Sequence, residues 1–278
     1  MIKIRILCEN YARKRYMLAE HGLSIWIETH NRNILFDTGQ SGIFSLNARQ
    51  AGVDISKADM AVLSHGHYDH TGGLPEFFKL NKHAPAYADE GAFHKRYNGN
   101  GEARINIGIP WLKDKNKEAY FERIIINKGL AEIDEDTFIL GKIPSLVSFE
   151  EVPQNFYMDD GKGSISKDMI TDEQMLIIRG KEGIYIFAGC SHAGVINGIT
   201  HVIKQFPDKN IAGVIAGMHL NGVSDMRIQK TIRKLSDLNI KTVIPLHCTG
   251  MTAICEMKRL LGERCRIMNA GDEFVLEE

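Results

Sequence analysis

Ser64-His65-Gly66-His67-Tyr68-Asp69-His70-Thr71-Gly72-Gly73 follows the apolar run Met60–Leu63, which we expect to be a buried strand. His65 and His67 are two positions apart, so their rings point the same way in an extended segment. Three imidazoles and the Asp69 carboxylate suit Zn²⁺, with iron or manganese as alternatives. The pattern H-x-H-x-D-H arises by chance in about one in a thousand chains of this composition. It therefore predicts a metal site, the alternative being a solvated loop whose histidines only cap a helix.

Three later segments share one design, in which an apolar strand ends in a histidine and a small-residue turn or a helix follows. They are Ile186-Phe-Ala-Gly-Cys190-Ser-His192-Ala-Gly194, Val214-Ile-Ala-Gly-Met-His219-Leu and Val243-Ile-Pro-Leu-His247-Cys-Thr-Gly250. The carboxyl ends of strands in an α/β sheet gather at one edge, where sites form. We expect His192 and His247 to join the cluster at 65–70, whereas ligand and structural roles stay open for His219.

The order of predicted elements is that of an α/β protein. Strands come first, at 2–7 and in a hairpin of 23–29 and 33–37. After residue 174, strands alternate with helices. The expected helices are 41–50, 74–80, 193–206, 224–238 and 252–261. We expect residues 1–278 to form a single domain.

Residues 95–172 interrupt this pattern. Their composition is typical of loops, with short strands expected at 121–127, 137–140 and 145–149. We interpret the segment as an insertion, a lid on one side of the core. Its aromatic residues either wall a pocket for a flat ring or form a small core of their own: Tyr97, Trp111, Tyr120, Phe156 and Tyr157.

Composition narrows the class of protein. The 278 residues include 34 Lys+Arg and 35 Asp+Glu, which gives a net charge of −1. This balance argues against a protein that binds nucleic acid through a broad basic surface. No apolar stretch approaches the length of about 18 residues that a membrane span needs. The five cysteines show no C-x-x-C pair and no disulfide framework, which favours the cytoplasm. The oligomeric state stays open.

With Phe36-Asp37-Thr38-Gly39, the histidine motif and the later strand-end positions, the sequence resembles the metallo-β-lactamase superfamily over most of the chain. The resemblance implies an αββα four-layer sandwich, with a site for one or two metals between the sheets. It implies that His65, His67 and His192 hold one metal, that Asp69, His70 and His247 hold a second, and that Asp37 anchors the histidine loop through hydrogen bonds.

One subgroup of the superfamily is similar to this chain in three segments, which are Gly189–Gly194, Gly217–Leu220 and His247–Gly250. The motif Asp172-Glu-Gln is similar to the same subgroup. Its members resemble the archaeal synthase of a dihydropterin–ribofuranosylaminobenzene phosphate conjugate on the route to methanopterin. Many superfamily hydrolases place an aspartate that bridges two metals where this chain has Cys190. Its thiolate either ligates a metal or is a small buried residue. His219 is then a substitute ligand or a substrate contact.

The predicted activity is metal-dependent hydrolysis or transfer on a small substrate that bears phosphate or carboxylate. Zinc draws the pKa of a bound water towards about 7, which activates that water at neutral pH. If one site fills, Asp69 orients the water as base. Thr249-Gly250 and Ala193-Gly194 open helices whose free N–H groups either bind the substrate anion or are simply capped.

Other functions remain as alternatives. A pterin-type synthase follows from the subgroup resemblance, and a non-catalytic metal-binding or sensor module fits the same ligands. Nucleic-acid processing predicts a basic clamp, which the sequence lacks. Reduction of oxygen or nitric oxide at a di-iron site resembles H-x-E-x-D-H, whereas this chain has His67 at the middle position.

Overall fold

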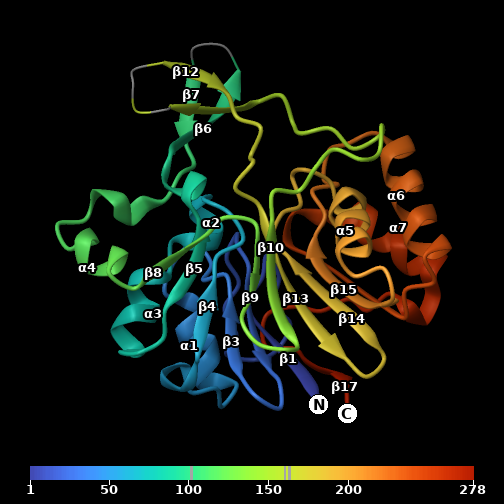
Figure 1. Ribbon diagram of the computed structural model, residues 1–278, viewed down its shortest axis with the longest axis horizontal. Coiled ribbons are helices and arrows are strands. Elements are labelled where there is room, and N and C mark those ends of the chain that lie inside the picture. Colours follow the sequence, from blue (N-terminus) through green and yellow to red (C-terminus); the bar gives the residue numbers. More distant parts are fainter. Residues whose placement is uncertain (101–102, 160, 162–163) are drawn as a thin grey trace.

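Two β-sheets pack face to face in the computed structural model, which describes residues 1–100, 103–159, 161 and 164–278 (Figure 1). The seven-stranded sheet has the order β17 (Glu273–Glu277), β1 (Ile2–Cys8), β2 (Ser24–Glu28), β3 (Asn33–Phe36), β4 (Met60–Val62), β5 (Ala86–Asp89) and β8 (Ile124–Asn127). The six-stranded sheet has the order β16 (Thr242–Leu246), β15 (Ile211–Gly217), β14 (Gly183–Ala188), β13 (Gln174–Gly180), β10 (Thr137–Gly141) and β9 (Leu130–Glu132).

Helices cover the outer face of each sheet. The helices α1 (Ile43–Gln50) and α3 (Leu74–Leu80) pack on the seven-stranded sheet. The helices on the six-stranded sheet are α5 (Val195–Gln205), α6 (Asp225–Asp237) and α7 (Met251–Leu261). The αββα sandwich that the resemblance implies is therefore confirmed.

Both faces of the central strands are buried, which explains their nearly continuous apolar sequences. In β14, Ile184 and Ile186 pack under the helices, whereas Tyr185 and Phe187 pack between the two sheets. This alternation follows from the two-residue period of a strand. The sandwich thus has one core between its sheets and one beneath each helical layer.

Residues 95–172 do not form one inserted unit. Strand β8 pairs in parallel with β5, and β10 pairs with β13, so residues 124–141 complete the two main sheets. The remaining strands form a separate four-stranded sheet in the order β12 (Ile165–Lys167), β11 (Phe156–Asp159), β6 (Lys95–Asn100) and β7 (Ala103–Asn106). We call these four strands the lid sheet; it stands above one end of the sandwich (Figure 1). The strand expected at 145–149 is wrong, because those residues form a turn and irregular chain.

A buried arginine fastens the lid sheet to the histidine loop. Arg96 on β6 is 1% exposed and pairs with Asp168 and, at 2.7 Å, with Asp172. The second carboxylate oxygen of Asp172 accepts a hydrogen bond from the backbone N of Gly66 at 2.8 Å. The guanidinium therefore positions the backbone between His65 and His67 through one intervening carboxylate.

Short helical turns connect these elements: α2 (Tyr68–Thr71), α4 (Lys117–Phe121), η1 (Ile55–Lys57), η2 (Glu90–Phe93), η3 (Pro110–Lys113), η4 (His247–Thr249) and η5 (Gly262–Arg264). Among the described residues, no helix has both the length and the apolar composition that a membrane crossing requires.

Candidate metal centre

Strand direction gathers the candidate residues at one rim of the sandwich. Strands β3 and β4 are parallel, and β1 runs the same way because it is antiparallel to β2, which is antiparallel to β3. In the other sheet β14, β15 and β16 are parallel. The carboxyl ends of all six strands meet at the rim. There the segments that begin at Glu9, Asp37, Ser64, Gly189 and His247 face one another.

Three imidazoles form a first group at this rim. The ring centroids of His65, His67 and His192 lie 4.5–5.0 Å apart, although His192 comes from the opposite sheet. All three rings are buried. Burial holds the pKa of each well below its usual range, so the rings are neutral at neutral pH and present lone pairs.

A second group forms beside the first. The Nε2 of His70 lies 3.1 Å from the Cys190 sulfur, and the rings of His70 and His247 are 5.0 Å apart. A carboxylate oxygen of Asp69 lies 3.3 Å from Nε2 of His247. Burial raises the pKa of Asp69, but His70, His21 and His247 outweigh it and hold that pKa well below the usual range, so Asp69 is ionised.

Asp37 orients the histidine loop. One oxygen accepts from the backbone N of Ser64 at 2.7 Å, and the other accepts from the Ser64 hydroxyl at 2.7 Å and from Nδ1 of His70 at 2.6 Å. The Ser64 hydroxyl, having donated to Asp37, accepts from Nδ1 of His65 at 2.9 Å. These bonds place protons on Nδ1 of both rings and turn Nε2 toward the centre, where Nε2 of His65 lies 2.9 Å from Nδ1 of His67. Burial lowers the pKa of His70, but the Asp37 and Asp69 carboxylates raise it to about 9.

Glu9 and Asn10, which follow β1, position His247. Glu9 accepts from the backbone N of His247 at 2.7 Å. The side-chain amide oxygen of Asn10 (Oδ1) lies 2.9 Å from Nδ1 of His247, and it accepts a hydrogen bond from the backbone N of Gly22 at 3.2 Å. Since that oxygen only accepts, Nδ1 of His247 carries the proton and Nε2 faces Asp69. The sequence interpretation missed both residues, although two polar residues directly after a buried strand were the available signal.

His21 is a further residue that the sequence interpretation missed. Its Nε2 lies 3.1 Å from Asp69, and its ring lies 4.8 Å from the His247 ring. The side chain is about half exposed, at 54%. Asp69 raises the pKa of His21 above its usual value by accepting a hydrogen bond from it. His21 thus stands at the entrance to the second group.

The amino end of α5 is closed by the chain's own carboxylates. Glu173 accepts from the backbone N of His192 at 2.6 Å and of Ala193 at 2.8 Å. Glu150 accepts from two backbone N–H groups in the first turn of the helix, at 3.0 and 2.7 Å. Burial raises the pKa of Glu173 to about 7. Of the two roles left open for Ala193-Gly194, the structure favours capping over anion binding, because those donors are already paired.

A cavity of about 470 Å³ opens onto both groups. His219, Gly250 and Phe156 line it, and the Phe156 ring lies 5.1 Å from the His192 ring. Thr249 does not line the cavity, because it is fully buried and its hydroxyl bonds to the carbonyl of Leu246 at 2.7 Å. Thr249 thus holds the η4 turn, which corrects its expected contact with substrate.

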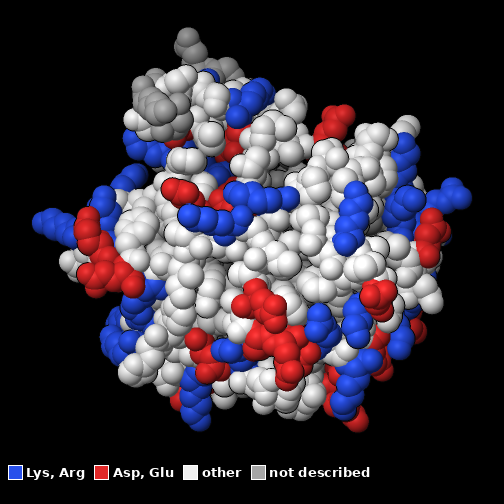
Figure 2. All heavy atoms as spheres, in the orientation of Figure 1, with Lys and Arg blue, Asp and Glu red and all other residues white. Residues whose placement is uncertain are grey.

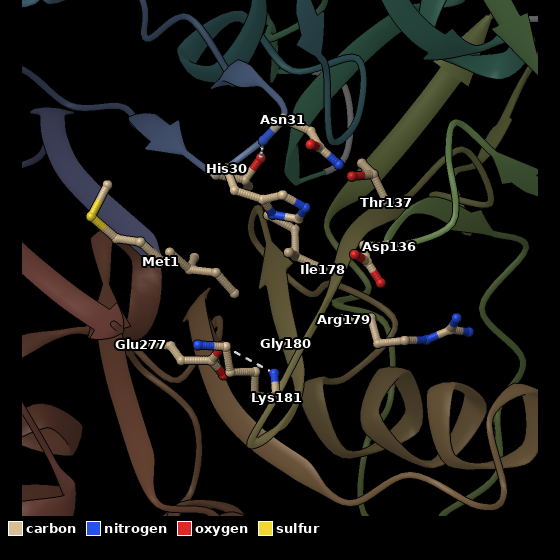
Figure 3. Close-up of a pocket in the computed structure, with 12 residues that line it drawn as sticks. Met1, His30, Asn31, Asp136, Thr137, Ile178, Arg179, Gly180, Lys181 and Glu277 are labelled. Atoms are coloured by element: carbon tan, nitrogen blue, oxygen red, sulfur yellow. Dashed lines mark hydrogen bonds between the residues drawn. The ribbon is translucent and has the colours of Figure 1, made fainter.

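The other large cavity lies elsewhere. Its volume is 480 Å³, and it lies near the chain ends, where Met1, His30, Arg179 and Glu277 line it (Figure 3). None of the candidate ligand groups found among the described residues includes one of its lining residues. The candidate metal ligands therefore lie at the rim and not at this second cavity.

Only part of the aromatic set walls the rim cavity. Phe156 lines it, whereas Trp111 packs with Tyr120 and Phe121 at ring distances of 5.6 and 5.9 Å. The Trp111 indole N–H donates to the carbonyl of Thr71 at 2.9 Å. Trp111 and Tyr120 thus belong to a local core beside α3.

The residues at the rim fit a divalent metal. Nε2 of His67 and both ring nitrogens of His192 are buried without a hydrogen-bond partner among the described residues. Leaving such an atom unpaired costs about 1–3 kcal/mol. His65 and His192 lie with Cys190 in one group of possible ligand atoms within 4.8 Å of one another, and His70 and His247 share Cys190 in another. Neutral imidazoles, a carboxylate and a thiol are the donors that zinc prefers.

Comparison with known proteins agrees with this geometry. The sequence profile of the metallo-β-lactamase superfamily matches residues 18–149. An uncharacterised protein of Methanocaldococcus jannaschii is 33% identical over 92% of this chain and 94% of its own length. The 7,8-dihydropterin-6-methyl-4-(β-D-ribofuranosyl)-aminobenzene-5′-phosphate synthase of the same organism is 30% identical over 91% of this chain and 89% of its own length.

Solved structures show the same relationship. A crystal structure described as a metal-dependent hydrolase of the β-lactamase superfamily superposes with a TM-score of 0.85 at 29% identity, covering 100% of both chains. The metallo-β-lactamase fold protein YhfI of Bacillus subtilis has a TM-score of 0.58 at 12% identity, covering 98% of both chains. The chain belongs to the metallo-β-lactamase superfamily.

Proposed function

We propose that the protein is a metal-dependent hydrolase or transferase that acts on a small substrate bearing phosphate or carboxylate. The observation that carries this proposal is the rim cavity, onto which both imidazole groups and the first turn of α7 open. Its volume of about 470 Å³ is in the ordinary range for a small-molecule site. The hydrolase with a TM-score of 0.85 supports a hydrolytic reaction.

The rim residues divide into two sets of ligands. His65, His67 and His192 would hold one ion, and Asp69, His70 and His247 a second, with Cys190 within reach of both. Zinc is the preferred ion on this donor set, with iron or manganese as alternatives. When bound, such an ion supplies Lewis acidity and lowers the pKa of a coordinated water.

The chain's own residues would bind and orient the substrate. The α7 helix begins after Gly250 without a side-chain cap, in contrast to α5, whose first N–H groups Glu150 occupies. Free N–H groups at a helix start attract an anion. Asp69 is ionised, and one of its carboxylate oxygens lies beside Nε2 of His247. This carboxylate would accept a hydrogen bond from the attacking group and so orient it. His219 also lines the cavity.

A pterin-type synthase is the second candidate. It is favoured by the 30% identity to the archaeal synthase over 91% of this chain. Tyr11, Tyr68 and Phe156 line the cavity and offer ring faces to a flat heterocycle. A non-catalytic metal-binding or sensor module would use the same ligands and would show metal content without turnover.

The expected setting of the reaction is the cytoplasm, with a small-molecule substrate as the partner. The cysteines are free thiols in the structure, in keeping with a reducing compartment. Basic and acidic side chains are interspersed on the face in Figure 2, which favours a small substrate over nucleic acid, as does the net charge of −1.

The test is metal analysis of the purified protein followed by a substrate screen. We expect the two imidazole groups to hold one or two zinc, iron or manganese ions per chain. The double variant His65→Ala/His67→Ala should lose metal, whereas the control His83→Ala/His94→Ala, which removes two exposed histidines, should not. Undiminished metal in the first variant would refute the assignment.

The screen covers phosphodiesters, phosphomonoesters, thioesters, lactones and pterin phosphates on metal-replete protein. Turnover should vanish with Asp69→Ala. It should persist with Asp59→Ala, because the carboxylate of Asp59 lies at the opposite end of β4. Full metal content with no turnover of any substrate class would favour the sensor alternative.

A further inference from the structure

Two residues at the rim remain outside both sets of imidazole ligands. His219 follows β15 and Cys248 lies in the η4 turn after β16. Together with Cys190, which follows β14, they form a third group whose possible ligand atoms all lie within 4.8 Å of one another. Three adjacent parallel strands thus each deliver one nitrogen or sulfur atom to one point.

The local backbone holds the sulfur of Cys248 at this point. It accepts a hydrogen bond from the backbone N of His219 at 3.3 Å and lies 3.5 Å from the carbonyl oxygen of Cys190. A Cβ at Gly217 would lie only 2.9 Å from that sulfur and 2.3 Å from the carbonyl oxygen of Gly189. Glycine at position 217 therefore keeps the space that Cys248 fills.

The backbone at His219 is strained in a way that aims its ring at the group. Its φ is +45°, in the left-handed region that residues with a side chain rarely adopt. The ring lies 4.4 Å from the His192 ring, and its Nδ1 is buried without a hydrogen-bond partner among the described residues. A ring nitrogen without a hydrogen-bond partner, placed beside two sulfur atoms, can serve as a ligand to a metal ion.

The group is also reachable from solvent. His219 and Cys248 are only partly buried, and both line the rim cavity together with Cys190. An ion held by these three atoms would be reached from the cavity and would have its remaining coordination position toward it. Two thiolates, one imidazole and an open position are the ligand set of a class of catalytic zinc sites.

We propose that Cys190, His219 and Cys248 form a third, sulfur-rich metal site for a thiophilic divalent ion such as Zn²⁺. Cys190 is common to this site and to both imidazole groups, so its sulfur joins the third ion to the main centre. The inference concerns metal binding alone and does not depend on the substrate or reaction proposed above.

The test uses Co²⁺, which occupies zinc sites and, unlike Zn²⁺, absorbs light. Metal-stripped protein is titrated with Co²⁺ under reducing conditions. A thiolate bound to Co²⁺ gives a charge-transfer band in the near ultraviolet, and the wild-type protein should show it. Cys248→Ser should lower the bound metal by about one ion per chain and weaken the band, because the thiolate bonds of that ion are lost and only Cys190 at the imidazole groups can still contribute.

Matched variants separate this site from the imidazole centre. Cys255→Ser, which removes an exposed thiol of α7, should leave the band unchanged. His65→Ala/His67→Ala should retain the band even as it loses metal from the first imidazole group. A wild-type spectrum in the Cys248→Ser protein, or loss of the whole band in His65→Ala/His67→Ala, would overturn the proposal.

Alkylation provides a second readout that needs no variant. Iodoacetamide should modify Cys248 more slowly in the Zn²⁺-loaded protein than in the stripped protein, as mass spectrometry of the peptides would show. Equal rates in the two states would contradict the site.

Discussion

A single carboxylate sets the direction of two imidazoles at the rim. Asp37 bonds directly to His70 and, through the Ser64 hydroxyl, to His65. Its φ of +57° is left-handed, so the chain accepts strain at this residue in order to aim both oxygens inward. The arrangement agrees with the anchoring role expected from Phe36-Asp37-Thr38-Gly39.

Asp37→Asn should therefore weaken zinc binding about 10- to 100-fold, because a carboxylate that orients a ligating histidine is replaced by a neutral amide. Competition against a chromophoric chelator measures the affinity. Asp59→Asn serves as the control, because the exposed carboxylate of Asp59 accepts from the backbone N of Asn33 at the end of β4 away from the rim. Equal affinities in the two variants would argue against the anchoring role.

Gly66 lies against the backbone of Ala92. A Cβ at this position would lie 2.0 Å from the carbonyl oxygen of Ala92, which is far inside van der Waals contact. Gly66→Ala should cost about 1–3 kcal/mol in the free energy of unfolding, measured by urea denaturation. In Gly42→Ala the new Cβ meets nothing nearer than 3.5 Å, so its change should stay within about 0.5 kcal/mol.

Sequence reasoning works for residues that follow a recognisable strand and fails for isolated ones. The segments ending in His192 and His247 were identifiable because each follows an apolar strand. Glu9 and Asn10 were missed, since nothing local shows that β1 ends beside β16 in the facing sheet. His21 was missed because it lies in an irregular segment without a repeating pattern.

The helices differ in whether the backbone N–H groups of their first turn are already paired with a side chain. The α5 start is paired with Glu150, whereas α6 is capped by the hydroxyl of Ser224, which accepts from the backbone N of Arg227. The α7 start follows Gly250, whose φ of +80° suits glycine and leaves its N–H groups facing the cavity. The sequence could not distinguish α5 from α7, because Glu150 is distant in sequence from the helix that it caps.

Glu150→Ala should destabilise the protein by about 1–2 kcal/mol, because two backbone N–H groups of α5 lose their carboxylate acceptor. Differential scanning calorimetry measures the loss. Its neighbour Glu151 is exposed and bonds to Arg227 through its backbone carbonyl, which the substitution keeps, so Glu151→Ala is a matched control. If both variants unfold alike, the cap is not stabilising.

The boundaries of the lid sheet could not be read from composition. Residues 124–126 are three isoleucines that extend the seven-stranded sheet, yet polar loops flank them on both sides. Parallel pairing with β5 needs a partner that is distant in sequence, so local propensity alone underdetermines it.

At the scale of the whole molecule, metal binding should be coupled to stability. The ligands come from both sheets, and unfolding separates them, so an ion bound only by the native state stabilises it by about 2.7 kcal/mol at a hundredfold excess over Kd. Removing metal with a chelator should lower Tm by on the order of 5 °C. Adding Zn²⁺ should restore Tm in the wild-type protein and much less in His65→Ala/His67→Ala. A Tm that ignores the chelator would contradict this coupling.

The overall class was predictable because nearly every central strand is apolar on both faces and late strands alternate with helices. The meeting of the two sheets at one rim is a property of topology. It was accessible only through the resemblance to a known superfamily.

Strand β1 pairs with β17, and the Arg5 side chain bonds to Glu273, 268 positions away. During translation β1 leaves the ribosome early, and its partner on that side emerges only after almost all of the remaining chain. The nascent polypeptide therefore carries an open strand edge, a template for aggregation, throughout its synthesis. Since Glu9 bonds to the backbone of His247, the second group of candidate ligands is completed only after residue 247 has been synthesised, and the edge of β1 stays open until β17 follows.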